Sequence, residues 1–238
     1  MRGERGLKVL SLFDGISCGK VALERSGFKD VTYYASEIDK DAIKISEHNH
    51  KDIIRIGDVC KVSYRNGILH TENGDFDVGK IDLLIGGSPC QSFSQAAAYS
   101  GNQTGLDGKS KLFFEYLRVL NEIKSENPNL KFLLENVKMK KESKVELDEY
   151  LGVNGVYCNS ELVSYQKRSR FYWTNWSWDL PEDRKISFQD YKQTVGTFKV
   201  LNKEMKSYRR MWNNGEGGNS QSSCANVTNA DKVYCLTT

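Results

Sequence analysis

Short runs of apolar residues alternate with segments of helical periodicity over the first two-thirds of the chain. A short apolar run bounded by turn residues predicts a buried strand, and apolar residues three and four positions apart predict the buried face of a helix. The alternation of the two predicts an α/β fold built on a parallel, doubly wound sheet. The runs that predict strands cover residues 8–13, 31–36, 53–56, 81–85, 132–134, 161–165 and 171–174.

Helices are predicted between these strands by apolar positions and by their end residues. The apolar positions are Val21 and Leu23, Ala42 and Ile45, and a longer series of Phe113, Tyr116, Leu117, Leu120 and Ile123. Gly27 is expected to end the first helix, and Asp39 can cap the start of the second. Ser143 and Glu146 match a capping box, which predicts a further helix that ends at Gly152.

The chain changes character after Trp178. Residues 179–238 are polar, with few apolar clusters and a stretch rich in Gly, Asn and Ser at 213–226. We therefore expect a main α/β domain over 1–178 and a separate, loop-rich region over 179–238. The last six residues of the sequence, 233–238, form a further strand-like run.

Composition excludes several classes of protein. Of the 238 residues, 39% are hydrophobic and 27% charged, which is not the composition of collagen, a coiled coil or a disordered chain. The net charge of +3 permits nucleic-acid binding but does not argue for it. A membrane helix and a secretory signal are not expected, because the apolar runs are too short. None of the six cysteines belongs to a Cys-x-x-Cys pair, so we expect reduced thiols in a cytosolic compartment and no structural zinc.

A glycine-bearing turn and two carboxylates suggest a binding pocket. Gly15 and Gly19 follow the first predicted strand, Glu37 ends the second, and Asp58 follows the third. Glu37 stands where a ribose-hydroxyl acceptor is usual, and Asp58 could accept a hydrogen bond from an adenine amino group. Each alone could be a structural turn or a solvated helix cap. Together they predict a site for an adenosine-bearing ligand, and the glycine spacing weakens a nicotinamide interpretation.

The segment Gly86-Gly87-Ser88-Pro89 presents Cys90 directly after a buried strand. The glycines allow an unusual backbone and the proline stiffens it. A thiol presented in this way is a candidate nucleophile, because the thiolate is the reactive form and backbone amides can lower its pKa. The alternative is a buried structural cysteine. No histidine is near in sequence, so activation would come from another donor or from the substrate.

Glu135 ends the next predicted strand, and in a closed site it could serve as an acid. Arg168 and Arg170 stand two residues apart, which would place them on one side of a strand. Such a pair can hold a phosphate or a base carbonyl, although a solvated charged face would give the same pattern.

These residues carry a family resemblance. The ordered segments FDGISCG, ASEID, GDV, GGSPCQSFS, KLFFEY, LLENV and QKRSRFYWTN resemble the DNA (cytosine-5) methyltransferase family, and especially its bacterial and phage enzymes and the eukaryotic de novo branch. The resemblance covers about residues 7–176. It implies a Rossmann-like catalytic, cofactor-binding domain over 1–178 and the start of a target-recognition region over 179–238.

The cofactor implied by the resemblance is S-adenosylmethionine, with S-adenosylhomocysteine as product and no metal. Glu37 would hold the ribose and Asp58 the adenine, with Ile38 and Val59 packed against the adenine ring. The whole implied set is Phe13, Asp14, Gly15, Ile16, Ser17, Cys18, Gly19, Glu37, Ile38, Asp58, Val59, Pro89 and Leu112.

The resemblance also implies a reaction on a cytosine flipped out of double-stranded DNA. Cys90 would attack ring carbon 6 while Glu135 protonates ring nitrogen 3, so that carbon 5 takes the methyl group; a base then removes the carbon-5 proton and Cys90 leaves. Arg170 would contact the base carbonyl and Glu135, and Arg168 would help to hold the site. A loop over 92–109 would close on the DNA. The implied DNA contacts are Gln91, Ser92, Ser94 and Lys109.

The resemblance implies an active enzyme in the cytoplasm of a bacterial or phage-infected cell, such as one from a restriction–modification system. Two other functions stay open. One is a catalytically silent accessory or regulatory DNA-binding subunit, which the intact Cys90, Glu135 and Arg170 disfavour. The other is a tRNA cytosine-5 methyltransferase, whose Cys-Phe-Thr element is missing here; an NAD oxidoreductase fits least.

The family's closing motif has no counterpart in the sequence. We therefore expect either a truncated chain, which is favoured, or one half of a split enzyme whose second chain supplies the rest. In both cases the chain alone should bind cofactor weakly and methylate DNA poorly.

Overall fold

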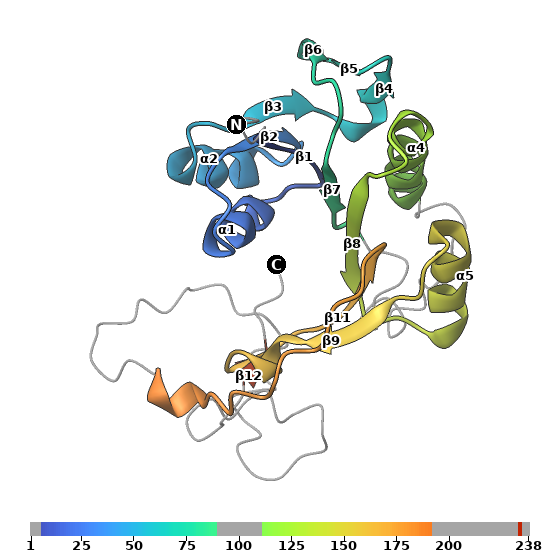
Figure 1. Cartoon of the computed structure of the whole chain (residues 1–238). Coiled ribbons are helices and arrows are strands. Elements are labelled where there is room, and N and C mark those ends of the chain that lie inside the picture. The colour runs from blue at the N-terminus through green and yellow to red at the C-terminus, as the bar shows by residue number, and fades with distance from the viewer. Residues whose placement is uncertain (1–5, 90–110, 192–232, 235–238) are drawn as a thin grey trace, which may run out of the picture. The chain divides into compact units, whose positions relative to one another are not determined.

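The computed structural model describes residues 6–89, 111–191 and 233–234. The chain divides into two compact units. Figure 1 labels their helices and strands. The first consists of Met1–Tyr157 and Arg170–Ser177, and the second of Cys158–Ser169 and Trp178–Thr238. No helix among the described residues is long and apolar enough to cross a membrane.

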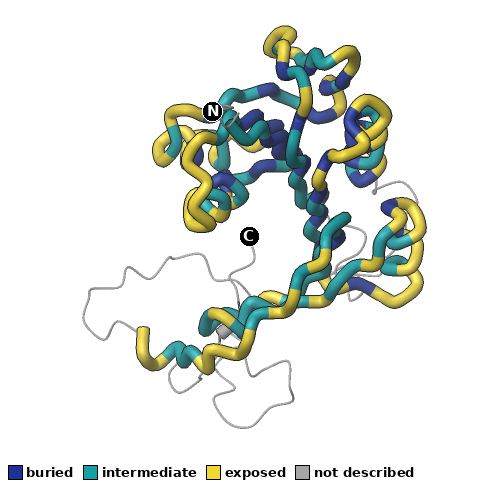
Figure 2. The backbone as a smooth tube through the Cα atoms, viewed as in Figure 1, coloured by how far each residue is buried: buried dark blue, intermediate teal, exposed yellow. Residues whose placement is uncertain are grey.

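A seven-stranded sheet organises the chain, in the order β3-β2-β1-β7-β8-β11-β9. The five strands from β3 to β8 run parallel, as predicted, whereas β11 is antiparallel to β8, so the sheet is mixed. The last four residues of both β1 and β2 are buried (Figure 2). The strands are β1 (Leu7–Leu12), β2 (Val31–Ser36), β3 (Ile54–Gly57), β7 (Leu83–Gly86), β8 (Lys131–Val137), β9 (Val156–Asn159) and β11 (Ser169–Thr174).

Helices cover both faces of this sheet, with α1 and α2 on one side and α4 and α5 on the other (Figure 1). The helices are α1 (Cys18–Arg25), α2 (Lys40–Asn49), α4 (Lys111–Glu126) and α5 (Lys141–Leu151). Asp39 caps α2 as predicted, accepting from the amides of Asp41 and Ala42 at 2.8 and 2.9 Å. Gly152, at φ 69°, ends α5. The predicted capping box is wrong, because α5 begins at Lys141 and Ser143 lies inside it.

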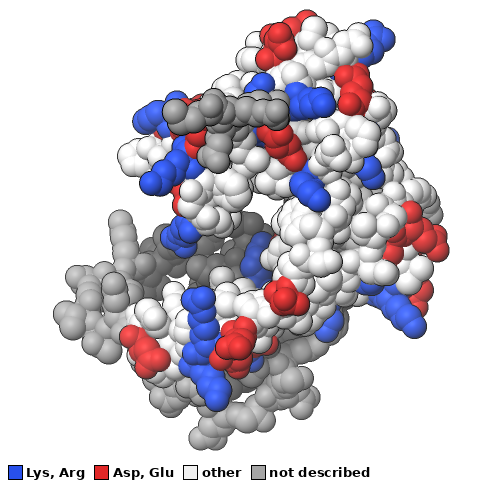
Figure 3. Space-filling view, viewed as in Figure 1, with Lys and Arg blue, Asp and Glu red and all other residues white. Residues whose placement is uncertain are grey.

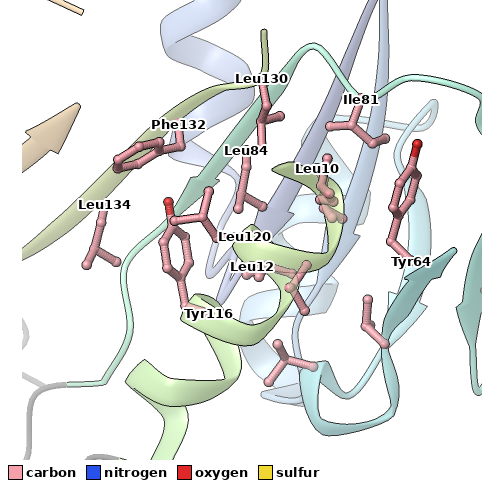
Figure 4. Packing of buried hydrophobic residues seen from close by; sticks show 14 of the residues in the cluster. Leu10, Leu12, Tyr64, Ile81, Leu84, Tyr116, Leu120, Leu130, Phe132 and Leu134 are labelled. Atoms are coloured by element: carbon pink, nitrogen blue, oxygen red, sulfur yellow. The ribbon is translucent and has the colours of Figure 1, made fainter. Parts of the chain in front are cut away.

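The main core lies between α4 and the sheet (Figure 4). The buried positions of α4 recur three and four residues apart and are Phe113, Tyr116, Val119, Leu120 and Ile123. They pack with sheet residues that include Leu10, Leu12, Leu84, Phe132 and Leu134, all fully buried. Each such side chain contributes about 1.5–3 kcal/mol on burial, so this face fixes α4 on the strands that carry the candidate site.

A three-stranded antiparallel sheet between β3 and β7 was not predicted. Its strands are β4 (Ser63–Arg65), β5 (Ile68–Thr71) and β6 (Gly74–Asp77). The turn between β4 and β5 is Asn66-Gly67, with φ values of 53° and 74°. Asn-Gly favours this kind of two-residue hairpin, so the sequence did hold a signal for it.

The predicted strand over 161–165 is wrong. Residues Ser160–Leu162 form a 3-10 turn, in which Asn159 accepts from the amide of Glu161. A short strand, β10 (Gln166–Lys167), follows and pairs in parallel with β12 (Val233–Tyr234). Two further 3-10 turns are Val59–Lys61 and Phe188–Asp190.

In the second unit, the ring of Tyr165 lies 5.4 Å from that of Phe188 and 5.6 Å from that of Tyr191. The assignment of residues 1–178 to catalysis and of 179–238 to target recognition stays a prediction.

Described acidic and basic side chains are interspersed on the face drawn in Figure 3.

Candidate active site

The loop between β1 and α1 has an unusual backbone. Phe13, Gly15 and Ser17 all have positive φ, at 57°, 58° and 65°. Such values cost about 1–3 kcal/mol at non-glycine residues and persist only where the surroundings enforce them. The amide of Asp14 donates to the carbonyl of Ser36 on β2 at 3.0 Å, which ties the loop to the carboxyl edge of the sheet.

The side chain of Asp14 is fully buried and stabilises this loop through hydrogen bonds. Its carboxylate accepts from the hydroxyls of Ser11 and Tyr33, each at 2.8 Å, and from the hydroxyl of Ser17. Arg55 of β3 lies 3.3 Å from it. Burial and the charge of Asp14 raise the pKa of Tyr33 far above its usual value, so the phenol remains a donor. Asp14 therefore shapes the loop, and its carboxylate has no free face for a ligand.

Helix α1 follows this loop and begins with Cys18 and Gly19. A Cβ on Gly19 would lie 2.3 Å from a side-chain carbon of Ile85 and 2.8 Å from the hydroxyl of Tyr33. Glycine is required here for close packing of the helix on the sheet. Cys18 is exposed.

Glu37, just after β2, joins the loop to the start of α2. Its Oε2 accepts from the amide of Gly15 at 2.7 Å, and its Oε1 accepts from the amides of Ile38 and Asp39 at 2.8 and 2.9 Å. A carboxylate has about four acceptor sites, so one on Oε2 is left for a hydroxyl donor.

Apolar and carboxylate groups flank Glu37 at the ends of β1, β2 and β3. Ile16 and Ile38 are 47% and 68% exposed, so their side chains are accessible to a ligand at these strand ends. Asp58 caps the 3-10 turn after β3 by accepting from the amide of Cys60 at 2.9 Å. Val59 is buried in the main core, so its side chain packs against protein.

Glu135 on β8 and Arg170 on β11 form an ion pair. Nε of Arg170 donates to Oε1 of Glu135 at 2.6 Å, and the two side chains are 16% and 27% exposed. A Cβ built on Gly87 would lie 3.2 Å from Oε2 of the same glutamate. The carboxylate therefore lies between a guanidinium and the backbone of the segment that leads to Cys90.

Asn136 anchors that segment from the opposite face of β8, and the sequence analysis did not single it out. Its side chain is almost fully buried, and its amide nitrogen donates to the carbonyl and hydroxyl oxygens of Ser88 at 3.4 and 3.3 Å. A Cβ on Gly86 would meet the Tyr116 ring at 2.9 Å. An asparagine inside a buried strand was the available signal, because buried polar groups need partners.

For the other predicted site residues, the structure gives only exposure or packing, or does not describe them. Pro89 is exposed, and Leu112 packs against the main core from the first turn of α4. The predicted residues Cys90, Gln91, Ser92, Ser94 and Lys109 lie outside the described residues.

The pairing of Arg168 with Arg170 on one side of a strand is wrong. Arg168 lies between β10 and β11, and it belongs to the second unit whereas Arg170 belongs to the first. The amide of Arg168 donates to Oδ1 of Asn159 at 2.8 Å, and Arg168 is part of neither strand. Among the described residues, no group of three or more His, Cys, Asp or Glu residues could hold a metal ion.

Comparison with known proteins agrees with this geometry. The family model "C-5 cytosine-specific DNA methylase" matches residues 7–151. The chain belongs to this family. The match includes the glycine loop, Glu37, Asp58 and Glu135, and the resemblance stated from the sequence is therefore confirmed.

Several curated methyltransferases are similar to this family member. Orphan methyltransferase M.SPRI of Bacillus phage SPR is 31% identical over 227 residues, which cover 87% of this chain and 46% of the relative. Type II methyltransferase M.FnuDI of Fusobacterium nucleatum is 38% identical over 132 residues, 56% of this chain and 33% of the relative. The chain thus spans less than half the length of these relatives.

Among solved structures, S. pombe Dnmt2 methyltransferase has a TM-score of 0.55 and 22% identity, covering 80% of this chain and 62% of the other. A Spodoptera frugiperda DNMT2 mutant gives 0.51 and 20%, over 81% and 61%. These likenesses confirm the predicted Rossmann-like α/β fold.

Proposed function

We propose that the protein transfers a methyl group from S-adenosylmethionine to carbon 5 of a cytosine in double-stranded DNA. The observation that carries the proposal is the Glu135 carboxylate, which is held by Arg170 beside the backbone of Gly87. Membership of the C-5 cytosine methylase family supports it, as do relatives named as phage and bacterial methyltransferases. Those relatives also support action in the cytoplasm of a bacterial or phage-infected cell.

The residues present fit S-adenosylmethionine, which when bound supplies an electrophilic methyl group. The loop around Gly15 exposes backbone that can approach a ligand, and Glu37 keeps one acceptor site for a ribose hydroxyl. Asp58 uses Oδ1 within its own turn, so Oδ2 can accept from an adenine amino group. Ile16 and Ile38 are exposed and would pack against the adenine ring.

Cys90 would supply the nucleophile that activates the cytosine. Its thiolate forms a bond to carbon 6 while protonated Glu135 donates its proton to nitrogen 3, which moves the electron pair toward carbon 5. After methylation, a base removes the proton from carbon 5, the bond from sulfur to carbon 6 breaks, and nitrogen 3 returns its proton.

Arg170 would contact the carbonyl oxygen of the flipped base and keep Glu135 oriented toward its ring. Unlike Lys, Arg has several donors in a fixed plane, so it can bind a carboxylate and a carbonyl at the same time. Arg168 and the predicted DNA contacts Gln91, Ser92, Ser94 and Lys109 remain part of the proposal.

A covalent trap tests the chemistry. The purified chain is incubated with S-adenosylmethionine and duplex DNA that carries 5-fluorocytosine in every short sequence context, and the products are run on a denaturing gel. Fluorine cannot leave as a proton does, so the protein–DNA adduct should persist in the wild type and be missing in Cys90→Ser. No adduct at any protein concentration would instead favour a silent DNA-binding subunit.

A further inference from the structure

Glu72 lies at the tip of the turn between β5 and β6, and its carboxylate reaches the end of β3. Oε1 accepts from the amide of Asp58 at 2.7 Å, and Oε2 lies 2.5 Å from Nζ of Lys61. The side chain of Glu72, which belongs to the three-stranded β4–β6 sheet, thus binds both the first and the last residue of the turn from Asp58 to Lys61.

The approach of Glu72 is close enough to restrict the residue beneath it. Gly57 has φ +78°, and a Cβ there would lie 2.2 Å from Oε1 of Glu72. The neighbouring Asn73 donates to the carbonyl of Arg55 at 3.0 Å, so the tip holds β3 at two points. Gly57 satisfies both the left-handed backbone and this contact.

Helix α4 holds the other end of the three-stranded sheet. Glu122 accepts from the amide of Tyr64 at 2.9 Å, and Glu126 accepts from the amides of Asn66 and Gly67 at 2.7 and 3.1 Å. Because α4 is fixed by the main core, the tip that carries Glu72 is supported at its base.

We propose that Glu72 is a positioning residue that sets Asp58 to recognise the 6-amino group of adenine. The inference rests on the proposed function, which assigns that contact to Asp58. Oδ1 of Asp58 is held by the amide of Cys60, so the direction of Oδ2 depends on the backbone at Asp58, and Glu72 binds that backbone directly. Lys61 balances the negative charge that Glu72 brings near Asp58.

The experiment compares two ligands on the full chain by calorimetry: S-adenosylhomocysteine, and its deaminated analogue S-inosylhomocysteine, which has a carbonyl in place of the amino group. In Glu72→Ala, binding of S-adenosylhomocysteine should weaken about tenfold, and the ratio of the two affinities should fall toward one. Glu72→Gln keeps an oxygen acceptor for the Asp58 amide, so its ratio should stay within about threefold of the wild type.

Asp75→Ala is the matched control, because Asp75 pairs with His70 at 2.9 Å on the same small sheet. Its affinity ratio should equal that of the wild type. Equal loss of affinity for both ligands in Glu72→Ala, or no loss at all, would overturn the positioning role. If Glu72→Ala does not fold, Glu72→Ser takes its place, because its short side chain also removes the acceptor for the Asp58 amide, and the same two outcomes support or overturn the inference. Wild-type protein that binds neither ligand would overturn the proposed function, and this inference with it.

Discussion

Arg170 and Glu135 stand diagonally across β11 and β8, with Nε of Arg170 2.6 Å from Oε1 of Glu135. The strand register places Arg170 opposite Val137, two residues beyond Glu135, so both charged side chains are on the same face of the sheet. Both are largely buried, and the pair is therefore less screened by water than an exposed one. The guanidinium of Arg170 therefore fixes the orientation of the Glu135 carboxyl group on this face of the sheet.

Removing Arg170 should therefore harm chemistry more than cofactor binding. Arg170→Met is expected to lower the single-turnover methylation rate by about 10²-fold, within the range for general acid catalysis, because Glu135 loses its orienting partner. The affinity for S-adenosylhomocysteine should change little. Lys131→Met, on the exposed first residue of β8, is the control. A rate equal to that of the control would remove Arg170 from the mechanism.

Cys90→Ser should abolish methyl transfer while cofactor binding survives. A thiolate is a far better nucleophile at neutral pH than a serine hydroxyl, so the rate should fall by roughly 10³-fold or more. Tritiated methyl transfer to DNA measures the rate and calorimetry measures the binding. Retained turnover in the serine variant would exclude Cys90 as nucleophile.

Glu37→Ala should weaken S-adenosylmethionine binding by roughly 1.5–3 kcal/mol, which is about 10- to 150-fold. The loss has two sources, since Glu37 also holds the amide of Gly15 at 2.7 Å. Glu37→Gln keeps an acceptor oxygen and should lose less. Calorimetry with unchanged affinity in the alanine variant would refute the assignment of Glu37 to the ribose.

The fold was predictable where the burial of a strand or helix face requires a recognisable pattern of apolar residues. The strands at 31–36 and 171–174 and the stripe on α4 carry enough apolar residues to be recognised in the sequence. The β4–β6 sheet was missed because its apolar positions are few, although Asn66-Gly67 marked its first turn. The false strand at 161–165 arose because Asn159 redirects the chain through side-chain hydrogen bonds, a local effect that hydrophobic pattern does not record.

The sequence singled out three carboxylates of the candidate site, whose roles stay predictions, but not the side chains that support them. Glu135, Glu37 and Asp58 stood out as carboxylates after strands. The roles of Asn136 and Glu72 depend on contacts with residues 48 and 14 positions away, which only the folded chain brings together.

Asn136→Ala tests one of these supports. It removes a buried donor from Ser88 and an acceptor from the amide of Val137, which lies 2.8 Å from Oδ1, and should cost about 1–3 kcal/mol of unfolding free energy. The exposed Asn154→Ala should change it by less than about 0.5 kcal/mol. Urea unfolding distinguishes the two. Equal stability of both variants would mean that Asn136 does not anchor the segment before Cys90.

Asp148 predicts a pH dependence of stability. Burial would raise the pKa of its carboxyl, but hydrogen bonds from Lys144, the Gly155 amide and Trp173 lower it below its usual value. A folded-state pKa below the unfolded one adds stability that is fully present above the unfolded value, near 4, and is lost as the pH falls through the folded value.

The wild type should therefore be more stable than Asp148→Asn at pH 7, and the difference should shrink as the pH falls below about 4. Urea midpoints measured from pH 7 to pH 3 give the comparison. A difference that stays constant over this range would contradict the assigned stabilisation.

Bisulfite sequencing tests the central claim most directly. A plasmid is recovered from cells that express the chain, or its Cys90→Ser variant, and every cytosine is examined for resistance to conversion. Because the chain alone is expected to methylate DNA poorly, we expect partial protection of cytosines within one short recurring sequence in the wild type and complete conversion in the variant. Complete conversion in both, with the wild-type protein present and folded, would contradict cytosine-5 methylation by this chain.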